Sequence, residues 1–145
     1  MIVGQGMVIP LESIGSAFEG VMPAVIATCS ADGTPNIGYL SQVSYVDSTH
    51  VALSFQFFNK THRYLTENSR ACVQLIEPMS MQHYQLDLVF EQMHTEGPVF
   101  DKMRVKLDAI AALTGMTGIF KLQGADVFRV LSCRPVPNNL ITRSD

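Results

Sequence analysis

The sequence predicts one α+β domain, mainly β, in which an antiparallel sheet curls into a small barrel and short helices lie beside it. The length of 145 residues and the 47% of apolar side chains suit a single domain with one core. Short segments of alternating or continuous apolar character are separated by turn residues, which is typical of six or seven antiparallel strands. Closing such a sheet would pair the edges that otherwise invite aggregation.

Composition argues against several classes of protein. The formal net charge is -3 and the ten Lys and Arg residues are scattered, so we expect no nucleic-acid partner. No apolar run reaches the roughly 20 residues that a membrane span requires, and a secretion signal is not evident. We therefore expect a cytoplasmic protein without a membrane partner.

The cysteines and histidines indicate neither disulfides nor a metal centre. The number of cysteines is odd, their spacing is wide and no C-x-x-C occurs, so a disulfide framework or a zinc site is not expected. The histidines do not fall at the spacing of metal ligands. These residues are Cys29, Cys72, Cys133, His50, His62, His83 and His94.

The first part of the chain predicts one helix and three strands. Apolar residues at helical spacing follow Pro10, which indicates a short amphipathic helix over Pro10–Phe18. Strands are expected over Pro23–Ser30, Asn36–Val46 and His50–Phe58, joined by tight turns into a meander. The second of these strands is polar enough on one face to meet a ligand.

The middle of the chain predicts two helices with strands between them. Asn59 is expected to cap a short helix that stops at Asn68. Strands follow over Ala71–Ile76 and Gln82–Thr95. A longer helix starts after Gly97 and Pro98 and ends at Gly115, and we expect it to cross a barrel mouth or a dimer seam.

The end of the chain predicts a closing hairpin and a tail. Strands over Gly118–Leu122 and Val127–Cys133 are joined by a turn at Gly124-Ala125-Asp126. Residues 134–145 form a polar tail marked by proline. The whole chain, residues 1–145, is therefore expected to form a single domain.

The segment Ser54–Asn68 concentrates the chemistry. A strand that ends in polar residues and runs directly into a helix presents free backbone N–H groups and the positive end of a helix dipole. Lys60 adds an ammonium, Thr61 a hydroxyl and Arg63 a further cation. This combination predicts a phosphate site, and the alternative is an ordinary capped helix with solvated charges.

The order of these motifs resembles a known family. The hairpin Asp32-Gly33-Thr34-Pro35, the strand that runs on to Tyr45, the strand Val51–Phe57 and the turn Asn59-Lys60-Thr61 follow one another as in the pyridoxamine-phosphate-oxidase-like, flavin-binding split-barrel family. The resemblance extends from residue 20 to residue 95. It implies a six-stranded antiparallel split barrel with flanking helices, a homodimer, and flavin mononucleotide (FMN) in two equivalent clefts at the dimer interface.

The resemblance also implies which residues hold the cofactor. Backbone groups of Leu40 and Ser41 and the side-chain amide of Gln42 would face the flavin ring. Residues of the next strand would approach the ribityl chain and the phosphate, and those of the following turn would bind the phosphate, with Lys60 as its main cation. The strand residues are Ser54, Phe55 and Gln56, and the turn residues are Asn59, Lys60 and Thr61.

The function expected from this resemblance is a flavin-dependent oxidoreductase that acts on an unidentified small molecule or electron donor. Because the cofactor carries the redox chemistry, no catalytic side chain is required. Pyridoxamine phosphate oxidation itself is not expected, since the C-terminal sequence RPVPNNLITRSD lacks the family's histidine-containing substrate pattern. The alternative is a non-catalytic flavin-binding module for sensing or dimerisation, and deazaflavin is the alternative cofactor.

Overall fold

A computed structural model of the chain describes residues 9–20, 22–40, 42–55, 59–115 and 121–136. For Phe55, Asn59, Lys60 and Thr114 it describes the backbone alone. The strands are β1 (Ala24–Cys29), β2 (Pro35–Leu40), β3 (Val43–Asp47), β4 (His50–Phe55), β5 (Arg70–Ile76), β6 (His83–His94) and β7 (Gly124–Pro135). The helices are η2 (Leu11–Phe18), α1 (Asn59–Glu67) and α2 (Pro98–Thr114).

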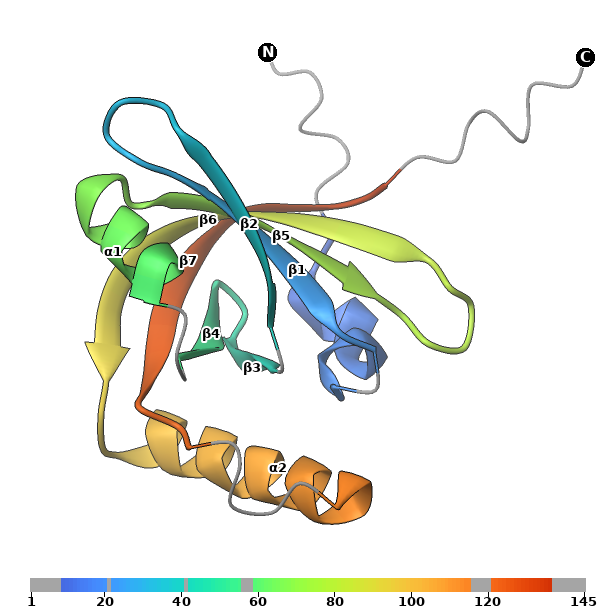
Figure 1. Ribbon diagram of the computed structural model, residues 1–145. Coiled ribbons are helices and arrows are strands. Elements are labelled where there is room, and N and C mark those ends of the chain that lie inside the picture. The colour runs from blue at the N-terminus through green and yellow to red at the C-terminus, as the bar shows by residue number, and fades with distance from the viewer. Residues whose placement is uncertain (1–8, 21, 41, 56–58, 116–120, 137–145) are drawn as a thin grey trace, which may run out of the picture.

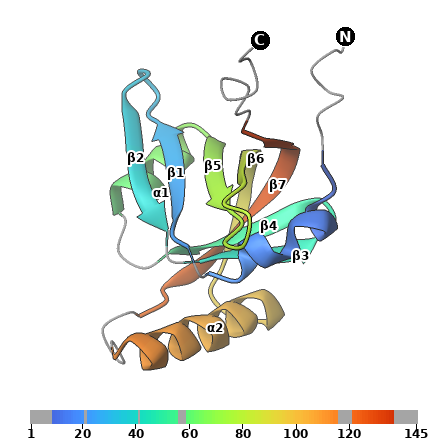
Figure 2. The same ribbon diagram turned by 90° about the vertical axis from the view of Figure 1, so that its right-hand side faces the viewer.

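The strands form one strongly curved antiparallel sheet, which confirms the predicted α+β class (Figure 1). The strand order is β2-β1-β5-β6-β7-β4-β3, so the β1–β2 hairpin lies at one edge and the β3–β4 hairpin at the other. Helix α1 lies beside β1 and β2, and α2 crosses one end of the sheet, as Figure 2 also shows.

The sheet has seven strands, which agrees with the six or seven predicted and is one more than the family resemblance implies, and the predicted strand Asn36–Val46 is two of them. β2 pairs with β1 and β3 pairs with β4, so the chain passes from one edge of the sheet to the other between Leu40 and Val43. The predicted three-strand meander is therefore wrong. Two hairpins form instead, and the chain between them contains Gln42, whose side chain is 1% exposed.

The C-terminal part of the sheet also differs from the prediction. Gly124-Ala125-Asp126, expected as a turn, is the first part of β7 and pairs with both β4 and β6. The predicted strand Gly118–Leu122 lies mostly outside the described residues, and residues 121–123 are not in a strand. β7 continues to Pro135, so the first two residues of the expected tail at 134–145 belong to the sheet.

The helices follow the expected positions closely. α2 starts at Pro98 and ends at Gly115, which adopts the left-handed conformation with a φ of 71° that glycine accepts without strain. α1 begins at Asn59 and ends one residue before Asn68. The first helix, η2, is a 3₁₀ helix interrupted at Ile14, so it is more tightly wound and less regular than the amphipathic helix that was expected.

Two apolar clusters hold the fold together. The larger fills the inside of the curved sheet, where η2 contributes Leu11, Ile14 and Phe18 against β3 and β5. Alternation along β4 turns Val51 and Leu53 into this cluster. Ala52, the residue between them, belongs to the smaller cluster on the opposite face, which is covered by α2 and contains Ala52, Met103, Leu107, Ala125 and Val127.

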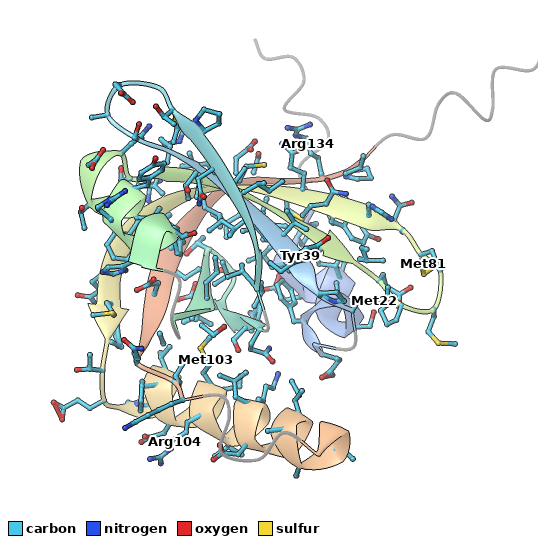
Figure 3. The ribbon with its side chains drawn as sticks, in the orientation of Figure 1. Met22, Tyr39, Met81, Met103, Arg104 and Arg134 are labelled. Carbon is cyan, nitrogen blue, oxygen red and sulfur yellow. The ribbon has the colours of Figure 1, made fainter. Side chains whose placement is uncertain are left out.

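Replacing Met103 tests the packing of α2 on the sheet. Met103 is 0% exposed and points from α2 toward the strands, whereas Arg104 points away (Figure 3). Met103→Ala is expected to lower the free energy of unfolding by about 2–4 kcal/mol, because it leaves a cavity. Val105→Ala, at a position 64% exposed, should cost about 0.5 kcal/mol or less. Equal losses in urea titrations of the two variants would contradict this packing.

Candidate functional site

The first turn of α1 is tied to the edge of the sheet through Thr61. Asn36 of β2 donates from Nδ2 to Thr61 Oγ1 over 3.0 Å and to Thr28 Oγ1 over 3.2 Å. A Cβ atom built on Gly38 would lie 3.9 Å from the same Thr61 oxygen, so β2 passes close to this turn. Because Thr61 Oγ1 accepts the bond from Asn36, its hydroxyl hydrogen remains able to donate to an anion.

The end of β4 supplies a buried hydroxyl without a partner. Ser54 is 2% exposed, and its backbone N–H donates to the carbonyl of Gln42 over 3.2 Å. Ser54 Oγ and Gln42 Oε1 have no hydrogen-bond partner among the described residues. The amide nitrogen of Gln42 donates to the carbonyls of Phe18 and Val43. Buried polar atoms are normally paired, so these two oxygens mark a place where a further group could bind.

An acid lies one strand away, at the start of β7. Asp126 is directly opposite Leu53 in the β4–β7 ladder, next to the Ala125–Ser54 pair. Its side chain is 7% exposed, and its Oδ2 lies 3.4 Å from Nδ1 of His62 on α1. The other oxygen, Oδ1, has no partner among the described side chains and backbone groups.

Burial raises the pKa of the Asp126 carboxyl to about 6, because the charged form loses its hydration. His62 partly opposes this rise through its charge and its hydrogen bond. The imidazole of His62 is itself held edge-on to the ring of Phe90, with the ring centroids 6.2 Å apart. The site therefore contains a carboxyl group that changes charge close to neutral pH, which is common at functional sites.

The structure describes seven of the nine predicted cofactor residues, which lie at the end of β2, just before β3, at the end of β4 and at the start of α1. Leu40 is buried at the end of β2, Gln42 and Ser54 are joined through the backbone, and Thr61 contacts β2. Phe55 ends β4, and Asn59 and Lys60 begin α1, so three residues separate the strand from the helix. Ser41 and Gln56 lie outside the described residues.

Three residues of this site were not predicted as such from the sequence. Asn36, His62 and Asp126 join the site through contacts between segments far apart in the chain. For Asp126 a local signal exists, since it is an acid within the apolar run Ala125–Phe128. Because Gly124-Ala125-Asp126 was expected to be a turn, where aspartate is common, the sequence offered no reason to expect Asp126 to be buried.

The donors described at the start of α1 are of the kind that suits a phosphate group. A nine-residue helix that starts here leaves its first backbone N–H groups without helical partners. Thr61 adds a hydroxyl donor in the first turn of this helix. The carboxyl of Asp126 is the group that fits poorly beside a dianion while it is charged.

Two further properties concern metals and membranes. Within the described ranges, no group of three or more His, Cys, Asp or Glu side chains is placed to hold a metal ion. None of the helices in the part of the chain that the structure describes is long and apolar enough to cross a membrane.

The strongly curved antiparallel sheet, with helices beside it, defines the class of protein as a split barrel. A family model described as Pyridoxamine 5'-phosphate oxidase matches residues 13–132. The chain therefore belongs to this family, which confirms the resemblance found in the sequence. No curated protein matches the chain.

Solved structures share the fold at low sequence identity. An FMN-binding protein from Syntrophomonas wolfei subsp. wolfei is 16% identical with a TM-score of 0.72, and the match covers 86% of this chain and 85% of that one. An F420 reductase is 16% identical with a TM-score of 0.56, covering 84% and 92%. HutZ, the heme storage protein from Vibrio cholerae, is 16% identical with a TM-score of 0.53, covering 90% and 93%. These likenesses establish the split-barrel fold.

The pKa of Asp126 predicts how stability depends on pH. The folded pKa of about 6 lies above the ordinary value of 3.8, so the carboxyl favours folding fully below pH 3.8 and loses this effect as the pH rises through about 6. At higher pH the buried charge costs at most about 3 kcal/mol. Asp126→Asn should therefore raise the free energy of unfolding at pH 7.5 by about 1–3 kcal/mol.

At pH 4 the Asp126→Asn variant and the unmodified protein should differ little. Chemical unfolding between pH 4 and pH 8 measures this difference. Asp101→Asn is the control, because Asp101 lies on the exposed side of α2 in a surface ion pair with Arg104. If Asp126→Asn changed the free energy of unfolding by the same amount at pH 4 and at pH 8, this would contradict the raised pKa of Asp126.

Proposed function

We propose that the protein binds FMN and is a flavin-dependent oxidoreductase acting on a small molecule. The observation that carries this proposal is the start of α1, where the hydroxyl of Thr61 lies in the first turn of a helix whose first N–H groups have no helical partners. Family membership and the FMN-binding neighbour of the same fold support it.

Each predicted residue has a role in this proposal. Asn59, Lys60 and Thr61 bind the phosphate, and the segment Ser54–Gln56 approaches the ribityl chain. Leu40, Ser41 and Gln42 border the flavin ring. Because the amide nitrogen of Gln42 is already bound to two carbonyls, its partnerless Oε1 is the atom left to accept a hydrogen bond from the ring.

The chemistry divides between cofactor and protein. FMN, when bound, supplies hydride or electron transfer. The protein holds the phosphate, orients the ring against the chain between β2 and β3, and excludes water with the buried side chains around Leu40 and Ser54. The substrate of this proposal is a small molecule of unassigned structure.

A deazaflavin cofactor and a non-catalytic role are the two alternatives. The F420 reductase of the same fold supports the first, and the heme storage protein supports the second because its described role is storage. Anaerobic addition of nicotinamide donors to the FMN-loaded protein separates an oxidoreductase from a non-catalytic module. Bleaching of the flavin supports the oxidoreductase, and no bleaching with any donor favours a binding module.

Replacing Lys60 tests the phosphate site. Lys60→Ala removes a charge-assisted contact and should weaken FMN binding by about 1.5–3 kcal/mol, measured by quenching of flavin fluorescence. Lys102→Ala on α2 is the matched control and should leave the affinity unchanged. Equal affinities for all three proteins, or purified protein that is colourless and does not take up FMN, would contradict the proposal.

We propose further that the working form is a cytoplasmic homodimer with FMN between the subunits. Ile37 and Tyr39 on the outer face of β2 are 72% and 69% exposed, and large apolar side chains gathered on an edge strand are typical of contact surfaces. Sedimentation at micromolar concentration should show a dimer. A monomer that still binds FMN would contradict this arrangement.

A further inference from the structure

The carboxyl group of Asp126 has no role in the flavin site as proposed so far. Among the described residues it is the one acidic side chain that is buried, and one of its oxygens has no partner. Burying an unpaired polar atom costs stability, so a structural role alone does not explain why an acid rather than an amide or an apolar residue stands here.

Among the side chains that the structure describes, one ionisable group, His62, contacts Asp126. Leu53 of β4 and Met93 of β6 lie opposite it in the two ladders, and neither is ionisable. On α1 it faces His62, whose Nδ1 is 3.4 Å from Oδ2. Of the nearest ionisable groups on β6, Glu91 is bound to His50 and Arg129, and His94 to Gln92.

This pair is coupled to the phosphate turn by the chain itself. His62 follows Thr61 in the first turns of α1, so the imidazole connects Asp126 to the helix start that presents its N–H groups. His62 is the fourth residue of α1, so a dianion bound at the start of this helix would lie about one helical turn from the residue that contacts Asp126.

We propose that Asp126 is the proton acceptor linked to phosphate binding: when the phosphate of FMN binds at the start of α1, the Asp126–His62 pair takes up one proton from the solvent. This inference rests on the proposed function. The proton adds to the partnerless Oδ1 of Asp126 and no covalent bond to carbon or phosphorus changes. Protonation removes a like charge from beside the dianion and turns Oδ1 into a hydrogen-bond donor.

A bound dianion changes the protonation of Asp126 in one direction. A dianion nearby disfavours the charged carboxylate, and since burial already raises the pKa of Asp126 to about 6, the further rise brings protonation into the neutral range. By linkage, FMN affinity must then fall as the pH rises, by up to about tenfold per pH unit for one proton. Phosphate itself titrates near pH 6, so a variant without the carboxyl is needed as the baseline.

The experiment compares the unmodified protein with Asp126→Asn and His62→Gln. FMN affinity is measured by fluorescence quenching between pH 5.5 and pH 8.5, and calorimetry in buffers of different ionisation enthalpy counts the protons taken up. Riboflavin, which lacks the phosphate, is the second ligand. Thermal unfolding of each variant confirms that it is folded under the conditions of the titration.

From pH 6 to pH 8, the FMN affinity of the unmodified protein should fall at least tenfold more than that of Asp126→Asn. Proton uptake on FMN binding should be absent in this variant. Riboflavin binding should not depend on pH, and His62→Gln should shift the pH at which affinity falls. FMN binding with the same pH dependence in the unmodified protein and Asp126→Asn overturns this inference and leaves the proposed function intact. No FMN binding by any of the proteins at any pH overturns both.

Discussion

The arrangement of this protein depends on β7, which pairs with β6 along one side and with β4 along the other. Without these two ladders the β3–β4 hairpin would have no strand to join the rest of the sheet, and α2 would lose the surface formed by Ala125 and Val127. The same strand presents Asp126 to α1. Structural packing and the electrostatics of the candidate site are therefore set by adjacent residues of one strand, which turn to opposite faces because side chains alternate.

Much of the fold could be predicted because the relevant signals are local. Pro98 and Gly115 mark the ends of α2, and alternation along residues 83–94 marks β6. The strand-to-helix turn at Ser54–Thr61 could likewise be recognised from residues close together in the chain. Within the described residues, the start of α1 offers the Thr61 hydroxyl and backbone N–H groups, and the use of these groups by a cofactor stays a prediction.

The features that were missed depend on pairing between distant segments. Residues Asn36–Val46 have continuous strand character, and nothing within them shows that the first half pairs with β1 and the second half with β4. The partner of Asp126 is separated from it by 64 residues in the chain. Asn36 meets Thr61 only because α1 folds back beside β2. Such contacts follow from topology, which periodicity does not encode.

The crossover at Gln42 has a consequence for how damage to this protein would spread. Both outer strands of the sheet, β2 and β3, are attached to the same short link, which is anchored by the Gln42 amide and by the Ser54 N–H. A substitution that breaks these contacts would loosen both edge strands of the sheet together and expose their backbone groups. The failure to expect from such a substitution is self-association into insoluble material, at a stage when most of the core is still formed.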